Sequence, residues 1–336
     1  MGKLGYTKAI SFISCYLYMP KRRVSLQQAR QIKIQQHKKL NSTDKSGLVI
    51  SRLGHHVEIE TTDNHIITCY LRTHLNSVVA GDKVSWQPLN ATQGVITSIF
   101  PRISVLEKKD MRGQAKAVAA NVTQLLIVLA PRPLPSWLLL DSYLVMADYL
   151  NLDVAIVLNK TDLPLSETQT WLDTYYKPLG YPILSTAFNQ PLSDEFLATL
   201  NAHTSVFIGQ SGVGKSSLIS RLIPHYQPIA IGSLSTQSQL GKHTTSYSRL
   251  YHLAQGGQVI DSPGVREFTL GPMSRAHIIQ GFRECAKLAH LCRFRNCAHD
   301  SNTPGCALIQ AIEEEKLAPS RLMHLQQLLA TYGIKP

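Results

Sequence analysis

The chain has 336 residues, a formal net charge of +12, 44% hydrophobic residues and 17% charged residues. This composition is ordinary for a globular protein with ample core and excludes a wholly disordered chain, and the length suggests about two domains. No segment is apolar for long enough to span a bilayer, so we expect a cytoplasmic protein without a membrane partner.

The positive charge is concentrated at the N-terminus. Residues 1–45 contain ten Lys or Arg and a single acid, Asp44, which gives this segment a net charge of +9. The basic stretch from Lys21 to Lys39, with few aromatic residues, cannot build a core, and we expect a flexible extension that binds a polyanion. A solubilising tail is the alternative. The first 18 residues, with an apolar run at residues 9–18, do not fit the pattern of the basic tail that follows. We therefore expect Met19 to be the natural start, which mass spectrometry of the N-terminal peptide would test.

Five short runs with partial alternation of apolar and polar residues come next, separated by turn-forming residues. They cover residues 47–52, 56–60, 65–71, 82–86 and 94–99. Five strands within about sixty residues fit a small closed barrel of the OB type. OB-folds often bind RNA, although a barrel of this kind can equally dock proteins.

A linker at residues 107–116 is expected to lead to a first strand of the next domain at residues 121–129. The following strand-like run ends in the tetrapeptide Asn159, Lys160, Thr161 and Asp162. A carboxylate at Asp162 can accept hydrogen bonds from N1–H and the 2-amino group of guanine, and adenine offers neither donor. A site built to pair with these two donors discriminates against an analogue that lacks them by a factor of ~10^4 or more. We expect Asn159 to contact the base and brace the phosphate loop, and the Lys160 stem to cover the base plane.

An apolar run at residues 206–208 leads into a glycine-rich loop and then into a segment with helical spacing of apolar residues. The loop comprises Gly209, Gln210, Ser211, Gly212, Val213, Gly214, Lys215, Ser216 and Ser217. Strand, loop and helix in this order are the context of a phosphate-binding loop, whose backbone N–H groups face the phosphates. Lys215 is expected to reach the β- and γ-phosphates, and the Ser216 hydroxyl to hold Mg²⁺. An ordinary glycine-rich turn is the alternative.

A further strand-like run ends in Asp261 and is followed by Gly264. Asp261 would bind Mg²⁺ through water, and Gly264 would place its N–H at the γ-phosphate. Between the phosphate loop and this run lie Thr244 and Thr245 in a polar stretch. One of these threonines is placed to bind Mg²⁺ in the triphosphate state, and we favour Thr245.

Val265 stands where many GTPases carry a glutamine that orients the attacking water. Because valine cannot hydrogen-bond water, unaided hydrolysis should be slow. His243 is the nearest candidate for this catalytic role, since a neutral imidazole can accept a hydrogen bond from water. The alternative is a loop histidine that contacts RNA or nothing.

The order of the motifs is the reverse of that in a familiar small GTPase. The base-reading tetrapeptide precedes the phosphate loop, with residues 185–187 as a weaker candidate for a loop that backs the base. Rejoining a chain at exposed, neighbouring termini preserves the packed sheet, so a circular permutation is physically accessible. In this arrangement the segment after Gly264, which should respond to the γ-phosphate, leads directly into the C-terminal region.

The C-terminal region carries four soft metal ligands within fifteen residues: Cys292, Cys297, His299 and Cys306. Three thiolates and one imidazole suit a closed tetrahedral zinc site that stabilises a small, loop-rich domain. Disulfides are the rival use of these cysteines, but the rest of the chain is typical of an enzyme from a reducing compartment. Cys285 is expected to be an ordinary helix residue.

These motifs, in this order, resemble the ribosome small-subunit-dependent GTPase A family of bacteria, from about residue 20 to the C-terminus. The resemblance implies an N-terminal OB-fold, a circularly permuted P-loop GTPase domain and a C-terminal zinc domain. It also implies GTP hydrolysis stimulated by the 30S subunit and a role in late maturation of that subunit.

The resulting prediction is a multidomain α/β protein with a basic extension at residues 1–45, an OB-fold at 46–105, a permuted GTPase domain at 106–275 and a zinc-binding helical domain at 276–336. We expect a monomer that holds one structural Zn²⁺, binds GTP or GDP with Mg²⁺, and contacts the 30S subunit and its 16S rRNA. Two alternatives stay open: a permuted GTPase that serves another ribonucleoprotein, and a zinc-bearing RNA-binding adaptor.

Overall fold

The structure is a computed structural model that describes residues 44–72, 75, 77–109, 113–164, 166–223, 248–262 and 270–334. Several predictions concern residues outside these ranges: nearly all of the basic extension, His243, Thr244, Thr245 and Gly264.

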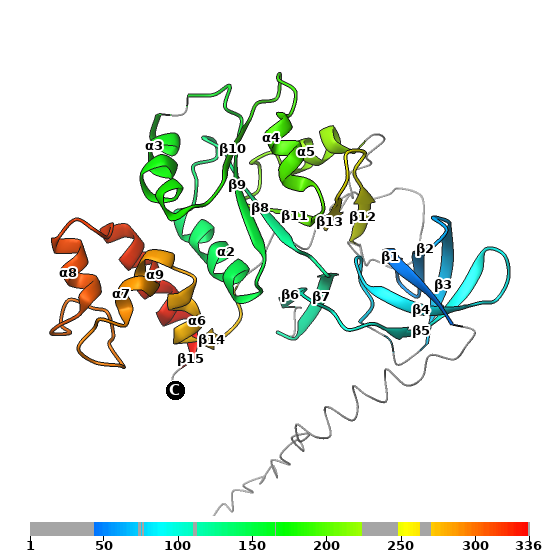
Figure 1. Ribbon diagram of the computed structural model, residues 1–336, viewed down its shortest axis with the longest axis horizontal. Helices are drawn as coiled ribbons and strands as arrows, with labels where there is room; N and C mark the ends of the chain where they lie inside the picture. Colours follow the sequence, from blue (N-terminus) through cyan, green and yellow to red (C-terminus); the bar gives the residue numbers. More distant parts are fainter. Residues whose placement is uncertain are drawn as a thin grey trace, which may run out of the picture. The chain divides into compact units, whose positions relative to one another are not determined.

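The predicted barrel is present, and its five strands match the five alternating runs (Figure 1). They are β1 (Lys45–Leu53), β2 (His56–Thr61), β3 (Ile66–Leu71), β4 (Lys83–Pro88) and β5 (Gln93–Ile99). Strand β1 pairs with both β2 and β4, which closes the sheet, and β3 runs parallel to β5. Alternate residues such as Val57, Ile59, Val84 and Ile96 are fully buried and fill the barrel, as the two-residue period of a strand requires.

The predicted linker at residues 107–116 is wrong, because this region belongs to a β-hairpin. Strand β6 (Val105–Lys109) pairs with β7 (Ala115–Ala120) in antiparallel register. The pairing buries Leu106 and Ala119 completely. The polar middle of this segment, rich in lysine, conceals the alternation that would have indicated two strands.

The sheet that contains the barrel strands continues into five parallel strands, the parallel sheet, which appear where the apolar runs predict them. They are β8 (Gln124–Leu129), β9 (Asp153–Asn159), β10 (Ile183–Thr186), β11 (Thr204–Ile208) and β13 (Gln258–Asp261), in the spatial order β10-β9-β8-β11-β13. Strand β12 (Arg249–His252) joins the edge of β13 in antiparallel register. It also meets the barrel, since Ser51 of β1 lies opposite Arg249.

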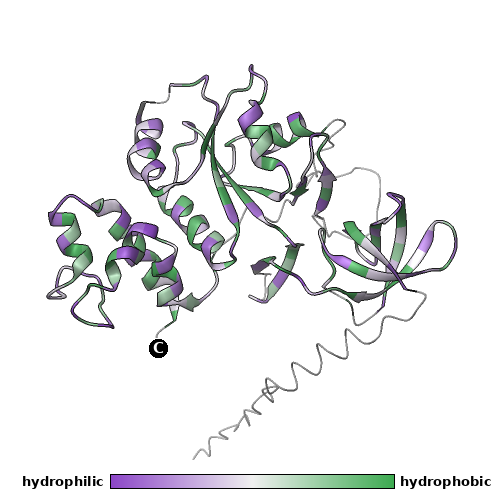
Figure 2. Cartoon of the chain, in the orientation of Figure 1, coloured by the Kyte–Doolittle hydropathy of each residue, from purple (hydrophilic) through white to green (hydrophobic). Residues whose placement is uncertain are grey.

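Both faces of the parallel sheet are covered, and β8 contributes to both cores (Figure 2). Leu125 and Ile127 face one core, whereas Leu126 and Val128 face the other. The first core includes residues of α2 (Trp137–Tyr149) and α3 (Ser166–Tyr175), and the second includes residues of α4 (Asp194–Leu200) and α5 (Lys215–Leu222). Burial on both faces explains why the strands read as continuous apolar runs.

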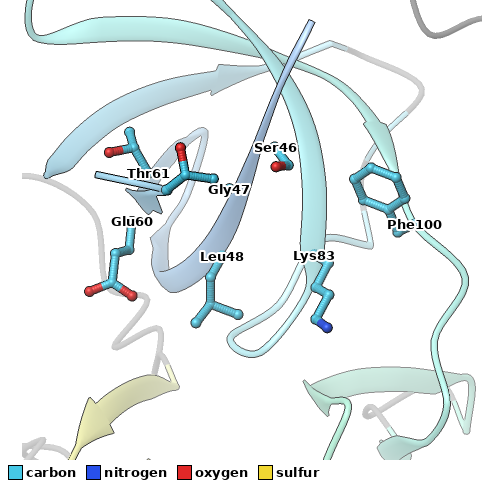
Figure 3. A pocket seen from close by; sticks show the side chains of 8 residues that line it. Ser46, Gly47, Leu48, Glu60, Thr61, Lys83 and Phe100 are labelled. Carbon is cyan, nitrogen blue, oxygen red and sulfur yellow. The ribbon is translucent and has the colours of Figure 1, made fainter. Parts of the chain in front are cut away.

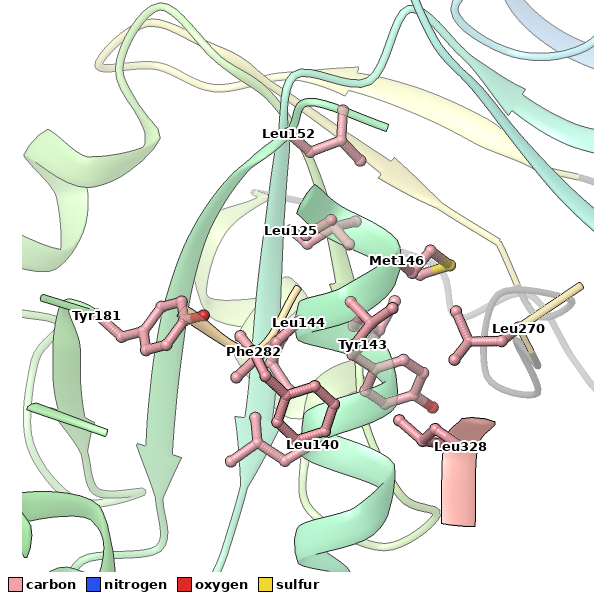
Figure 4. Packing of buried hydrophobic residues seen from close by; sticks show 14 of the residues in the cluster. Leu125, Leu140, Tyr143, Leu144, Met146, Leu152, Tyr181, Leu270, Phe282 and Leu328 are labelled. Carbon is pink, nitrogen blue, oxygen red and sulfur yellow. The ribbon is translucent and has the colours of Figure 1, made fainter. Parts of the chain in front are cut away.

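The C-terminal helices share the first of these cores. They are α6 (Arg275–Gln280), α7 (Arg283–Ala289), α8 (Ala307–Glu313) and α9 (Pro319–Tyr332), beside a short pairing of β14 (Met273–Ser274) with β15 (Gly333–Ile334). Phe282, the N-cap of α7, and Leu328 of α9 pack with Leu140 and Tyr143 of α2 (Figure 4). In the part of the chain that the structure describes, no helix has the length and apolar character needed to cross a bilayer.

A buried cluster of charged and polar side chains lies at this junction. The Asp141 carboxylate on α2 accepts hydrogen bonds from the Tyr176 hydroxyl (2.8 Å) and from Arg321, and it contacts His324 Nδ1 at 2.6 Å. Arg321 Nε donates to Glu284 Oε1 at 2.5 Å. Arg321 and Asp141 are almost inaccessible to solvent, with exposures of 2% and 1%. Helix α2 is therefore joined to α7 and α9 by paired buried charges.

Candidate functional site

The glycine-rich loop connects β11 to α5 and has the shape of a phosphate-binding loop. Gly209 has φ 139° and Gly214 has φ 97°, values that favour glycine. A Cβ on Gly209 would lie 2.2 Å from the Val128 carbonyl oxygen, and one on Gly214 would lie 2.2 Å from Asn159 Nδ2. Both positions therefore require glycine for space as well as for conformation.

Lys215 begins α5, and its side chain folds into the loop. Its Nζ donates to the carbonyl oxygens of Gly209 (2.6 Å) and Gln210 (2.5 Å), and the residue is buried. The ammonium group thus lies inside the loop, in the space that phosphate oxygens would occupy. Ser216 follows it in the first turn of α5, where helix N–H groups add partial positive charge.

The tetrapeptide that ends β9 contacts the phosphate loop directly. Asn159 Nδ2 donates to the Val213 carbonyl oxygen at 2.8 Å, and its Oδ1 accepts from the Thr186 hydroxyl at 2.9 Å. Asn159 is 5% exposed, so its amide braces the loop. Lys160, in the left-handed conformation, donates to the Gly212 carbonyl oxygen at 2.6 Å.

Asp162 is exposed and lies beside the loop that follows β10. The Thr161 N–H donates to the Thr186 carbonyl oxygen at 3.1 Å, which brings the next residues of the two loops close together. The backbone of Asp162 therefore lies close to residues 185–187, the weaker candidate for a base-backing loop, and its carboxylate is accessible to solvent.

The side chain of Gln210 has a role that the sequence did not indicate. Its Oε1 accepts from the Ser136 N–H at 2.8 Å, and its Nε2 donates to the Leu134 carbonyl oxygen at 3.3 Å. Ser136 is the N-cap of α2. The phosphate loop is thereby tied to the beginning of α2, whose other contacts include the buried cluster around Asp141.

Asp261 ends β13, the strand next to β11 in the parallel sheet. The carboxyl ends of parallel strands meet at one edge, so Asp261 lies at the same edge as Gly209 and Asn159. Asp261 is buried, with 4% exposure. The other predicted residues of this part of the site, His243, Thr244, Thr245 and Gly264, lie outside the described ranges.

The four predicted metal ligands come together in the C-terminal region. The Sγ atoms of Cys292, Cys297 and Cys306 and a ring nitrogen of His299 all lie within 4.8 Å of one another. His299 Nδ1 is 3.7 Å from the Sγ atoms of both Cys292 and Cys306. A tetrahedral metal with bonds of about 2.0–2.3 Å needs ligand atoms separated by roughly this much. The donor set therefore fits one metal ion with no position left for substrate.

The surroundings of this cluster hold its ligands in place. The Ala307 N–H donates to Cys292 Sγ at 3.4 Å, and Gln326 Nε2 donates to the His299 carbonyl oxygen at 2.5 Å. Burial raises the pKa of the Cys297 thiol to about 12 and lowers the pKa of His299. A bound cation opposes the first effect, because it stabilises the thiolate over the thiol. Cys285 lies outside the cluster, buried in α7, as predicted.

The barrel carries a groove of about 320 Å³ that includes no residue of the motifs above (Figure 3). It is lined by Ser46, Gly47, Leu48, Glu60, Thr61, Thr62, Lys83 and Phe100. Glu60 also contacts His252 of β12, with Oε2 and Nε2 2.8 Å apart. The groove therefore lies close to the contact between the barrel and the parallel sheet.

This chain is similar to known proteins in both sequence and structure. The family model described as RsgA GTPase matches residues 99–271. A Pseudomonas aeruginosa (strain LESB58) protein named small ribosomal subunit biogenesis GTPase RsgA is 44% identical over 292 residues, which cover 86% of each chain. The crystal structure of YjeQ from Thermotoga maritima matches with a TM-score of 0.69 at 26% identity, over 85% of this chain and 98% of that one.

A second crystal structure, of YloQ, is described as a circularly permuted GTPase. It matches with a TM-score of 0.65 at 25% identity, over 87% of this chain and 96% of that one. The motif order, the closed barrel and the Cys3His cluster therefore occur here on the fold that those proteins share.

Proposed function

Because the chain belongs to the RsgA GTPase family, we propose that it hydrolyses GTP while bound to the 30S ribosomal subunit and acts in late maturation of that subunit. The small subunit is suggested by the names of the relatives, and the observation that carries the GTPase part of the proposal is the contact between Asn159 and the Val213 carbonyl oxygen. It joins the base-reading tetrapeptide to the phosphate loop although their order in the chain is reversed. One pocket can then hold both ends of a guanine nucleotide.

Within this pocket different residues would bind different parts of the nucleotide. The loop from Gly209 to Ser217 would enclose the phosphates, with Lys215 exchanging its two carbonyl partners for phosphate oxygens. Asp162 would pair with the guanine edge, and Lys160 and Thr161 would support that contact. Ser216, Asp261 and Thr244 or Thr245 would hold Mg²⁺, which neutralises charge developing on the phosphates. Gly264 would donate its N–H to the γ-phosphate.

The direct test of the activity is phosphate release from GTP and from ATP, with and without purified small subunits. We expect hydrolysis of GTP alone, stimulated by the subunits, and loss of both basal and stimulated release in Lys215→Ala. A rate of phosphate release from GTP that does not rise when small subunits are added would favour a permuted GTPase that serves another ribonucleoprotein. Absence of any release would favour the RNA-binding adaptor.

For the catalytic role of His243 we expect His243→Ala to keep GTP binding and lose most subunit-stimulated turnover. The reason is that Val265 cannot orient water, so the imidazole would take over this role. Nucleotide titration and single-turnover phosphate release separate the two effects. Unchanged stimulated turnover in this variant would refute the assignment.

The contacts to RNA would come from the basic extension and the barrel. The +9 charge of residues 1–45 suits the phosphates of 16S rRNA and implies strongly salt-dependent binding. We propose a cytoplasmic monomer divided into the extension (1–45), the barrel (46–105), the GTPase domain (106–275) and the metal-binding helical domain (276–336).

The metal that we propose for the cluster of Cys292, Cys297, His299 and Cys306 is one structural Zn²⁺. Thiolate and imidazole ligands in a closed set favour this ion. We expect one equivalent of zinc per chain by atomic absorption, and loss of that zinc in Cys297→Ser. Circular dichroism should then show a lower total helix content, because α7 and α8 flank the cluster. Cys285→Ser, which changes a buried thiol outside the cluster, is the control and should keep the metal.

A further inference from the structure

Arg221, near the end of α5, holds the loop that follows β10. Its Nη1 donates to the Ala187 carbonyl oxygen at 2.9 Å, and its Nη2 donates to the Gln190 carbonyl oxygen. The planar guanidinium group therefore binds two main-chain acceptors of one short loop. The two nitrogens of a guanidinium are held in a fixed planar fork, which a lysine, with one nitrogen at the end of a shorter side chain, does not match at this position.

The beginning of the same loop is fixed by the base-reading tetrapeptide. The Thr186 hydroxyl donates to Asn159 Oδ1 at 2.9 Å, and the Thr186 carbonyl oxygen accepts from the Thr161 N–H at 3.1 Å. Residues 187–190 are thus attached at one end to the tetrapeptide and along their length to α5. Because α5 begins with Lys215, Arg221 ties this loop to the helix that carries the phosphate loop.

The loop begins directly after Thr186, whose carbonyl oxygen accepts from the Thr161 N–H, so its first residues lie close to the backbone of Asp162. If Asp162 takes N1–H and the 2-amino group, the next polar atom on that edge is O6, an acceptor. Main-chain N–H groups are donors and would form hydrogen bonds with O6. The 6-amino group of adenine is also a donor, so it would be repelled by the same N–H groups. The position of the loop therefore affects the choice between the two bases.

We propose that Arg221 is a positioning residue for base recognition, which holds residues 187–190 with their main chain toward position 6 of the purine. This inference rests on the proposed function, since it requires a guanine nucleotide in the pocket. Arg221 contributes to specificity through the loop. Its effect should therefore fall on the base and leave the phosphates untouched.

The test is calorimetric titration of the full chain with GDP, ADP and magnesium tripolyphosphate, which lacks a base. We expect Arg221→Ala to weaken GDP binding by about 10-fold, the size typical of lost hydrogen bonds from a charged group, and to leave tripolyphosphate unchanged. The preference for GDP over ADP should fall, and Arg221→Lys should recover only part of it. Arg283→Ala is the matched control, because Arg283 also donates to one main-chain carbonyl, that of Leu179 at 2.8 Å.

Hydrogen exchange supplies a readout that does not need nucleotide. Amides of residues 187–190 should exchange faster in Arg221→Ala, while those of α5 keep the wild-type rate. The inference is overturned if GDP and tripolyphosphate weaken equally, or if the GDP to ADP ratio stays at its wild-type value. If the wild-type protein itself shows no preference for GDP over ADP, the proposed function fails. If the wild-type protein prefers GDP and Arg221→Ala keeps that preference, only the inference about Arg221 fails.

Discussion

Asp162→Asn is expected to change the base that the pocket accepts from guanine to xanthine. The exposed carboxylate of Asp162 offers only acceptors, which suit N1–H and the 2-amino group of guanine. An amide presents an NH2 group in place of one of these acceptors. That group repels the 2-amino group but can donate to the 2-oxo group of xanthine. GDP binding should fall by ~10^4-fold, as for a site that loses its polar partner.

Competition between GDP and XDP, measured by calorimetry, checks this prediction. XDP should bind the variant more tightly than it binds the wild-type protein. The matched control is Asp173→Asn on α3, where a partly exposed carboxylate lies 3.7 Å from Lys177. This control changes the same functional group outside the site and should leave both affinities as they are. If Asp162→Asn keeps wild-type GDP affinity, Asp162 does not read the base.

Arg321→Ala should be the most destabilising single change outside the nucleotide site, at about 3–5 kcal/mol of unfolding free energy. The guanidinium pairs with Asp141 and Glu284, and it lies over the rings of Tyr176 and Phe282 at 5.0 and 4.7 Å. Its removal takes the guanidinium partner from two carboxylates, of which Asp141 keeps only its contacts with Tyr176 and His324. Glu284 Oε2 already has no hydrogen-bond partner in the structure. The paired charges raise the pKa of Arg321 despite its burial, so the group stays charged.

Urea unfolding followed by tryptophan fluorescence measures the effect. Trp137 on α2 stacks on Trp171 and on Tyr176, the Asp141 partner, with ring centroids 5.4 and 5.9 Å apart. Two of the three tryptophans therefore report on this junction, whereas Trp86 reports on the barrel. Arg283→Ala is the control: Arg283 is exposed and lies over Tyr181 at 4.0 Å, so its loss should cost about 1 kcal/mol or less. If the two changes lower the unfolding free energy equally, the buried charge pairs of Arg321 contribute no more to stability than the exposed contacts of Arg283.

Much of the site could be predicted because its motifs follow strands. Apolar runs at residues 153–158 and 206–208 end where ligand-binding loops begin, and the parallel sheet brings those ends together. The four residues of the Cys3His cluster are close in sequence, so short-range spacing was sufficient to group them. The barrel strands followed from alternation, except for the hairpin β6–β7, whose alternation is obscured by polar residues.

The contacts that connect the parts could not be predicted in the same way. Asp141 and Arg321 are 180 residues apart, and Gln210 and Ser136 are 74 apart, so no local pattern relates them. An acid within the apolar sequence of α2 was a signal that Asp141 needs a buried partner, but it does not say which one. Arg221 gave no signal, because a basic residue in the last turn of a helix is ordinary.

The central claim is that separate segments of a permuted chain form one guanine-nucleotide pocket. Equilibrium titration of the wild-type protein with GDP and ADP in the presence of Mg²⁺ measures this most directly. One GDP per chain should bind, with ADP weaker by ~10^4-fold because it lacks the donors that Asp162 requires. Equal affinity for the two nucleotides, or binding of GDP that survives in Lys215→Ala unchanged, would contradict the account.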